Sequence, residues 1–235
     1  MLPKAYRNLR QFVISRENVG QIIDNIGGLE KLVDYINDPL VTAEILQFRE
    51  ARERNPYGLA RNVILFAMLS PQTRFEANVT AFHNLLAIWD RNPSLEEIRE
   101  AIVGVQFSAT KAQRILDARK FLDDENLPTR MNRHNLLKLK GMGHKTTSFA
   151  LALFDDLSPV FTLDLHMLRA ISWATGFGHD VNVILRKNVH TTLEDAVVNY
   201  LREKSVASPF VAQWSLWNAW GFNRHVSHLP ILEGV

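Results

Sequence analysis

The sequence contains no cysteine in its 235 residues. This absence excludes disulfide bonds, thiolate zinc sites and iron–sulfur clusters held by cysteine. We therefore expect no cofactor, and we expect the hydrophobic core alone to stabilise the fold. His225 and His228 form a His-x-x-His pair, but two ligands without further partners do not make a metal site, and we predict no metal.

Long hydrophobic runs are also missing. No stretch approaches the roughly 18 consecutive apolar residues that a membrane helix needs. The first residues, from Met1 to Tyr6, turn polar at once, unlike a signal peptide. We expect a soluble cytoplasmic protein that does not bind membranes and that is associated with the nucleoid if its source is bacterial. A content of 46% hydrophobic and 22% charged residues is typical of a globular chain.

Alternating apolar residues, the signature of a strand, are rare and short. Apolar residues instead recur at steps of three and four, which is the helical spacing. One set predicts a single buried helix face: Val19, Ile22, Ile23, Ile26 and Leu29. Similar spacing predicts helices near residues 63–69, 82–89, 98–105 and 115–122, and Ser94 with Glu97 has the pattern of a capping box. We therefore predict an all-α protein.

The most informative segment runs from Asn135 to Phe154. A short apolar helix is predicted to meet Gly141-Met142-Gly143, and a second helix to follow. The two glycines allow a sharp turn and a close approach to another molecule. The start of the second helix presents free N–H groups and a positive dipole end, which suit an anion such as a DNA phosphate.

Acidic residues are absent from residues 130–145, whereas five basic residues lie there: Arg130, Arg133, Lys138, Lys140 and Lys145. The whole chain carries a formal charge of only +2. Positive charge is therefore concentrated where the glycines would meet a phosphate backbone. Without this charge, the same glycines would be equally typical of a plain helix corner with solvated lysines.

A lysine and an aspartate stand at two successive helix starts. Residues 160–163 predict a short extended link, after which Asp164 stands where a helix N-cap belongs. One helix and one return link would bring Lys145 and Asp164 into one cleft. A carboxylate stabilises the positive charge that develops on a sugar when its bond to a base breaks, and an amine can attack the same sugar carbon to form a Schiff base. Alternatively, the aspartate is only a cap and the lysine only a solvated residue or a phosphate contact.

Two stretches resemble the helix-hairpin-helix DNA glycosylase superfamily, which includes endonuclease III and the 8-oxoguanine glycosylases. They are Leu139-Lys140-Gly141-Met142-Gly143-His144-Lys145-Thr146 and Leu163-Asp164-Leu165-His166-Met167-Leu168-Arg169. The family pattern is a Leu-Pro-Gly-x-Gly-x-Lys hairpin followed by a Val-Asp-x-His segment. In members with lyase activity, a lysine occupies the position of Lys145 and an essential aspartate that of Asp164. The resemblance therefore implies a DNA glycosylase that also cleaves abasic sites, with these two catalytic residues.

Two further segments support the resemblance, which spans about residues 60–175. Residues 69–73, Leu-Ser-Pro-Gln-Thr, are similar to a family segment whose glutamine reaches into DNA near the extruded base, and residues 104–115 are similar to a glycine-led helix start. The implied partner is double-stranded DNA that contains an altered base. We predict that six residues bind it: Gln72, Lys140, Gly141, Gly143, His144 and Thr146.

The resemblance also implies two helical domains that flank a DNA-binding cleft. One would comprise residues 1–55 with 146–235, and the central one residues 56–145, ending in the helix-hairpin-helix. We expect a monomer. Lys140 replaces the hairpin proline of the family, and the cysteine cluster of endonuclease III is absent, so no iron–sulfur cluster is expected. The residues with which well-known members recognise their bases have no recognisable counterpart, so the substrate stays undetermined.

Three other hypotheses stay open at this point. Similar proteins could excise hypermodified bases of viral DNA, in phage defence or in base modification. A helix-hairpin-helix module could bind DNA without catalysis, because binding needs the glycines and the basic residues but neither Lys145 nor Asp164. A helical protein-interaction domain would make the clustered charge accidental.

Overall fold

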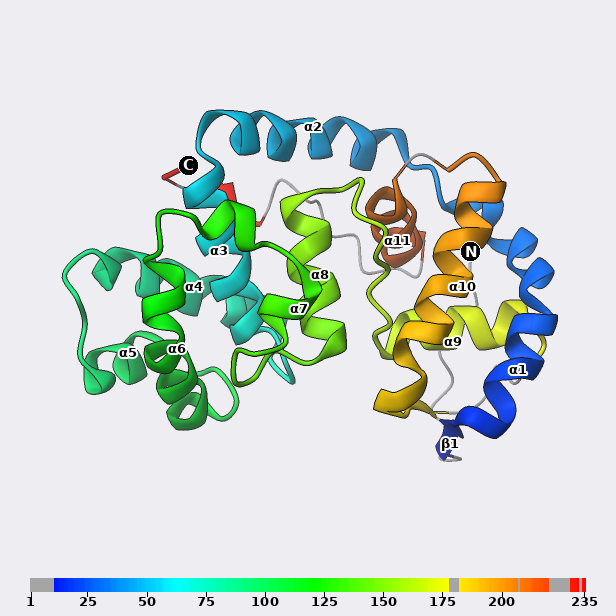
Figure 1. Ribbon diagram of the computed structural model, residues 1–235, viewed down its shortest axis with the longest axis horizontal. Coiled ribbons are helices and arrows are strands. Elements are labelled where there is room, and N and C mark those ends of the chain that lie inside the picture. The colour runs from blue at the N-terminus through cyan, green and yellow to red at the C-terminus, as the bar shows by residue number, and fades with distance from the viewer. Residues whose placement is uncertain (1–10, 178–181, 207, 220–228, 233) are drawn as a thin grey trace. The chain divides into compact units, whose positions relative to one another are not determined.

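The computed structural model describes residues 11–177, 182–206, 208–219, 229–232 and 234–235. Its secondary structure is mostly helical, as the predicted all-α class requires (Figure 1). The chain divides into two compact units: unit 1, Met1–Leu46 with Asp156–Val226, and unit 2, Gln47–Asp155 with Ser227–Val235. These divisions fall inside helix α2 (Pro39–Arg54) and after helix α8 (His144–Phe154), whereas the sequence placed its boundaries at residues 55/56 and 145/146.

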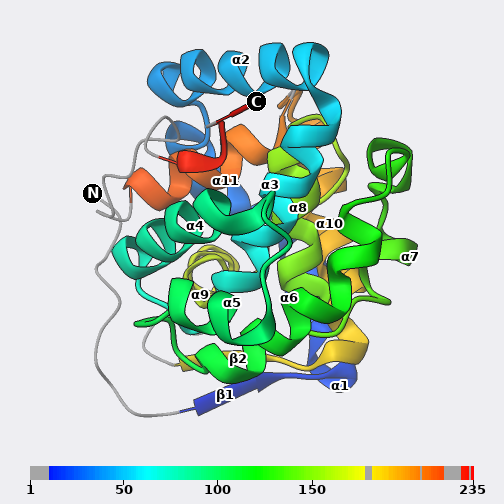
Figure 2. The ribbon, with the colours of Figure 1, turned by 90° about the vertical axis from the view of Figure 1, so that its left-hand side faces the viewer.

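Unit 1 is built around an apolar core to which helices and a two-stranded sheet contribute. Its described elements, with η denoting a 3₁₀ helix, are β1 (Gln11–Ile14), α1 (Arg16–Asp24), η1 (Ile26–Tyr35), α9 (Leu165–Ala174), β2 (Asn182–Leu185), η3 (Lys187–Val189), α10 (His190–Glu203) and α11 (Pro209–Trp217). The strands β1 and β2 pair in parallel, as Figure 2 shows. This short sheet was not predicted, because each strand contains only four residues.

The helix predicted over residues 19–29 is interrupted in the structure. Helix α1 ends at Asp24, and Ile26 and Leu29 lie on η1 instead. Successive glycines disfavour an α-helix at this point, and a Cβ on Gly28 would collide with the carbonyl oxygen of Ala174. The glycine thus lets η1 approach the backbone at the end of α9, while both predicted apolar side chains still face inward.

Unit 2 contains the remaining described helices. They are α3 (Pro56–Leu69), α4 (Phe75–Trp89), α5 (Leu95–Ala101), α6 (Ser108–Leu122), η2 (Leu127–Arg130), α7 (Arg133–Leu136), α8 and η6 (Pro230–Leu232). Helix α3 is buried along nearly its whole length and packs against α4, α6 and α8 (Figure 1). It therefore forms the centre of the unit, around which the other helices are arranged.

The helices predicted within unit 2 are confirmed, with one shorter than expected. The capping box is present, since the Ser94 backbone N–H donates to Glu97 Oε2 at 2.8 Å. Helix α5 ends at Ala101, and Val105 lies in the turns that precede α6. Within the part of the chain that the structure describes, no helix is both long and apolar enough to cross a bilayer.

Candidate functional site

The glycine turn, residues 140–143, joins the short helix α7 to α8. Gly141 has a φ of +93°, in the left-handed region that favours glycine. A Cβ at this position would also lie only 2.8 Å from Cδ of Arg114, whose side chain covers the turn. Buried Met142 closes the turn by donating its N–H to the carbonyl oxygen of Leu139 at 3.1 Å. A glycine is therefore required at position 141 by the fold itself.

Gly143 is different, because nothing in the fold requires a glycine there. It is the N-cap of α8 with a φ of −89°, and apart from its chain neighbours no described atom lies within 4 Å of the place where its Cβ would be. No side chain caps α8. The first amides of a helix have no partner inside the helix, and the dipole makes this end positive. The start of α8 therefore has the form of an anion-binding site.

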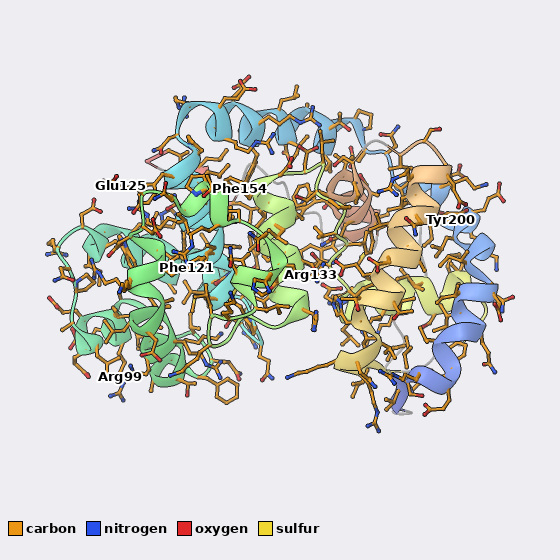
Figure 3. All side chains as sticks on the ribbon, in the orientation of Figure 1. Arg99, Phe121, Glu125, Arg133, Phe154 and Tyr200 are labelled. Carbon is orange, nitrogen blue, oxygen red and sulfur yellow. The ribbon has the colours of Figure 1, made fainter. Side chains whose placement is uncertain are left out.

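The first turn of α8 carries three of the predicted site residues. Lys145 is exposed, His144 is half-buried, and Thr146 is buried. Arg133, labelled in Figure 3, begins α7 just ahead of the glycine turn. An exposed lysine thus projects from an uncapped helix start that directly follows a sharp turn, with further basic residues beside it in the sequence.

One face of α6 connects the glycine turn with the loop that carries Gln72. Lys111, Arg114 and Asp117 follow one another at intervals of three residues and so lie along this face. Arg114 packs on the glycine turn, as described above. Asp117 Oδ2 accepts a hydrogen bond from Lys140 Nζ at 2.9 Å, and this bond, with a second from Gln113, holds the pKa of Asp117 below its ordinary value. Lys140 itself stays exposed to solvent.

Lys111 holds the Gln72 loop by three hydrogen bonds. Its ammonium donates to the carbonyl oxygens of Leu69 and Pro71, each at 2.7 Å, and to Oγ1 of Thr73 at 2.8 Å. The side chain is only 4% exposed, and burial together with the charge of Arg114 lowers the pKa of Lys111 from 10.5 to about 8. Leu69 ends α3, where the helix dipole favours a cation.

Gln72 projects from the loop that Lys111 holds. Its side chain is exposed, and its φ of +57° is uncommon for a residue other than glycine. The predicted DNA contacts Gln72 and Lys140 are therefore braced by one helix within the same unit. The role of Lys111 was not predicted, because the lysine matched the family pattern only as part of a helix start.

Phe107 is a second residue that the sequence analysis missed. Its side chain is 62% exposed, and its φ of +59° is costly for a bulky residue. Its carbonyl oxygen accepts a hydrogen bond from the backbone N–H of Lys111 at 2.9 Å. An exposed aromatic side chain held in a strained conformation is typical of functional sites. The signal in the sequence was a large apolar residue between the polar residues Gln106 and Ser108.

Asp164 belongs to unit 1, where it is the N-cap of α9 as predicted. Its Oδ1 accepts hydrogen bonds from the backbone N–H groups of His166 at 2.9 Å and Met167 at 2.8 Å. The residue is 6% exposed, and no donor among the described residues bonds to Oδ2. Residues 160–163 form neither helix nor strand, so they are a link as predicted, but its extended form stays a prediction, and the N–H of Asp164 donates to the carbonyl oxygen of Thr162 at 2.9 Å. Lys145 lies in unit 2, so the convergence of the two side chains on one sugar stays a prediction.

No metal-binding cluster is found within the described ranges, where no group of three or more histidine, aspartate and glutamate side chains could hold an ion. His225 and His228 lie outside those ranges. No protein family, curated protein or solved structure with which the chain was compared matches it. The case for a function therefore depends on the chemistry of this chain's own residues.

Proposed function

We propose that the chain is a DNA glycosylase that excises an altered base from double-stranded DNA and then cleaves the abasic site. Lys145 is the nucleophile and Asp164 is its carboxylate partner. One observation carries the proposal: Lys145 is an exposed amine on the first turn of an uncapped helix, directly after a left-handed glycine turn. The proposal includes a helix-hairpin-helix in residues 133–154, a monomeric protein and a location in the cytoplasm.

In this proposal, the glycine turn and the start of α8 bind the DNA backbone. A backbone phosphate would accept hydrogen bonds from the first amides of α8, where Gly143 leaves open space. Lys140, exposed beside the turn, adds a positive charge that attracts the same strand. Gln72 and Phe107, both exposed, then occupy the gap that an extruded nucleotide leaves in the stack, and Lys111 holds the loop of Gln72 through the carbonyl oxygen of Pro71.

The chemistry is a displacement at the sugar carbon that carries the base. The amine of Lys145 attacks C1′, the bond from C1′ to the base breaks, and the base leaves with the bonding electrons and gains a proton. Asp164 assists loss of the proton from the amine and stabilises the positive charge on the sugar. The sugar ring opens to a Schiff base, and elimination then expels the 3′ phosphate. This sequence requires that both side chains reach one sugar.

Borohydride trapping tests the proposal directly. The protein is incubated with a duplex that contains one abasic site, and hydride from borohydride reduces the Schiff base to a stable amine that links protein to DNA. Wild type is expected to give the adduct, and Lys145→Gln none, with little change in DNA affinity. Lys138→Gln is the matched control, because it removes an exposed lysine from the same basic segment. An adduct with Lys145→Gln would overturn the assignment of the nucleophile.

The same assay separates the alternative functions. A DNA-binding module without catalysis binds the duplex but gives no adduct, and a protein-interaction domain does neither. A panel of duplexes with oxidised purines, oxidised pyrimidines and glucosylated cytosines then identifies the base that is released. Release of glucosylated cytosine alone would favour the hypothesis of action on hypermodified viral DNA.

A further inference from the structure

The link between α8 and α9 is held by buried side chains from another part of the chain. Residues 160–164 have no partner strand, so their backbone N–H groups need other acceptors. Glu194 Oε1, on α10, accepts from the N–H of Phe161 at 2.9 Å. Gln213 Oε1, on α11, accepts from the N–H of Thr162 at 2.8 Å. Two adjacent amides of the link are therefore bonded by side chains from two different helices.

The position of Glu194 is costly for a carboxylate. The residue is 1% exposed and its neighbours along α10, Leu193 and Val197, belong to the apolar core of unit 1. A buried charge is tolerated only where hydrogen bonds or a partner compensate it. Oε1 has the Phe161 amide, and Oε2 lies 3.5 Å from Nδ1 of His190. An apolar side chain would avoid this cost but would leave the link amide without its acceptor.

The link leads directly to the carboxylate that the proposed function requires. Asp164 donates its own N–H to the carbonyl oxygen of Thr162 at 2.9 Å, and its side chain begins α9. A displacement of about 1 Å in a catalytic group can lower a rate by about a hundredfold. The two amides that Glu194 and Gln213 bond lie two and three residues before that group, so they set the path by which the chain reaches it.

We propose that Glu194 and Gln213 are positioning residues that set the place of the Asp164 carboxylate for the reaction at the sugar. The inference rests on the proposed function and names residues outside the stretch of about 60–175 over which the resemblance extends. Neither side chain touches the DNA. Each acts through the backbone of the link, Glu194 at Phe161 and Gln213 at Thr162.

Substitutions of Glu194 that keep or remove the acceptor of the Phe161 N–H test the proposal. Glu194→Gln keeps an oxygen for the Phe161 amide and loses the charge, whereas Glu194→Met keeps the length and loses the acceptor. The probe is a duplex with one abasic site, for which the single-turnover cleavage rate and the affinity are both measured. We expect Glu194→Met to cleave about tenfold to a hundredfold more slowly at unchanged affinity, and Glu194→Gln to recover most of the rate.

Leu193→Ala is the matched control for loss of stability. It removes fully buried apolar volume from the adjacent position on the same helix and bonds to no part of the link. At an assay temperature where every variant is folded, Leu193→Ala is expected to cleave at the wild-type rate. The proposal is overturned if Leu193→Ala slows cleavage as much as Glu194→Met, or if Glu194→Met cleaves as fast as wild type. Gln213→Met repeats the test at the second acceptor, so the result does not depend on one variant folding.

Hydrogen exchange separates failure of this inference from failure of the proposed function. If wild type neither cleaves nor gives the borohydride adduct, the proposed function has failed. Exchange of the Phe161 and Thr162 amides, measured by NMR, still tests how the link is held. If the Phe161 amide exchanges faster in Glu194→Met than in Leu193→Ala, the inference that Glu194 holds the link is supported. Equal exchange in the two variants overturns that inference.

Discussion

Two helix starts in this molecule are built in opposite ways. Helix α8 begins at Gly143 with no side-chain cap, whereas α9 begins at Asp164, whose Oδ1 already accepts two backbone N–H groups. An uncapped start offers donors and a positive dipole end to an outside anion. A start capped by an aspartate offers a carboxylate fixed by its own helix. Under the proposed function, α8 would bind the phosphate and present the amine, and α9 would supply the negative charge.

The largest effect is expected from Asp164→Asn, which removes the charge but keeps the cap. Asparagine caps a helix about as well as aspartate, so the melting temperature should change little. Loss of the charge should slow single-turnover cleavage of an abasic-site duplex by about a hundredfold to a thousandfold. Asp156→Asn, an equally buried exchange at the start of the same link, serves as the control and should cleave normally. If Asp164→Asn cleaves at the wild-type rate, Asp164 serves only as the N-cap of α9.

Lys111→Met is expected to have the next largest effect. It leaves the carbonyl oxygen of Leu69 without its donor, at a cost of about 1–3 kcal/mol in the free energy of unfolding, whereas that of Pro71 keeps a hydrogen bond from Thr73 Oγ1 at 3.3 Å. Because the loop is released, DNA affinity should also fall. Urea unfolding and fluorescence anisotropy with duplex DNA measure the two effects. Unchanged affinity would contradict the view that this ammonium orders the Gln72 loop for binding.

The same variant also gives a prediction about pH. Lys111 has a pKa of about 8 in the folded protein, against an ordinary value of 10.5. Above pH 8, the folded state therefore releases a proton that the unfolded state still holds. Consequently, the free energy of unfolding of the wild type should rise, relative to that of Lys111→Met, between about pH 8 and pH 10.5. If the free energies of unfolding of the two proteins instead change in parallel with pH over this range, the lowered pKa of Lys111 is contradicted.

Smaller effects are expected from substituting the two glycines of the turn, one on stability and the other on DNA affinity. Gly141→Ala forces a left-handed residue and a contact with Arg114, and should destabilise the fold by about 1–2 kcal/mol. Gly143→Ala meets no neighbour within the protein, so its main effect should be on DNA affinity. Unfolding and binding curves for both variants distinguish the two effects. Full DNA affinity of Gly143→Ala would mean that no phosphate approaches the start of α8.

The smallest effect is expected from Lys140→Gln. Its ion pair with Asp117 is exposed and screened by solvent, so the free energy of unfolding should hardly change. Loss of one phosphate contact should reduce the slope of log K against log salt by about 0.9. Lys120→Gln, at an exposed position on α6, is the control and should leave the slope unchanged. If the slope is unchanged in Lys140→Gln, Lys140 does not contact a DNA phosphate.

Features that depend on a few neighbouring residues could be predicted from the sequence. The capping box at Ser94 and Glu97, the N-cap at Asp164 and the sharp turn at Gly141 are each set by local backbone geometry. The predominance of helices followed from the apolar spacing alone. The helix predicted over residues 19–29 was too long because it included the two successive glycines after Ile26, which disfavour an α-helix.

Only the tertiary structure decided which distant residues hold the site in place. Lys111 bonds the loop at Leu69, Glu194 and Gln213 bond the link before Asp164, and β1 pairs with β2 across most of the chain. Such pairs form because a buried polar group must find a partner wherever the fold brings one. A sequence records the type and order of these groups, but not their distances in space. The sequence by itself therefore determined the helices and their starts, and folding determined what braces them.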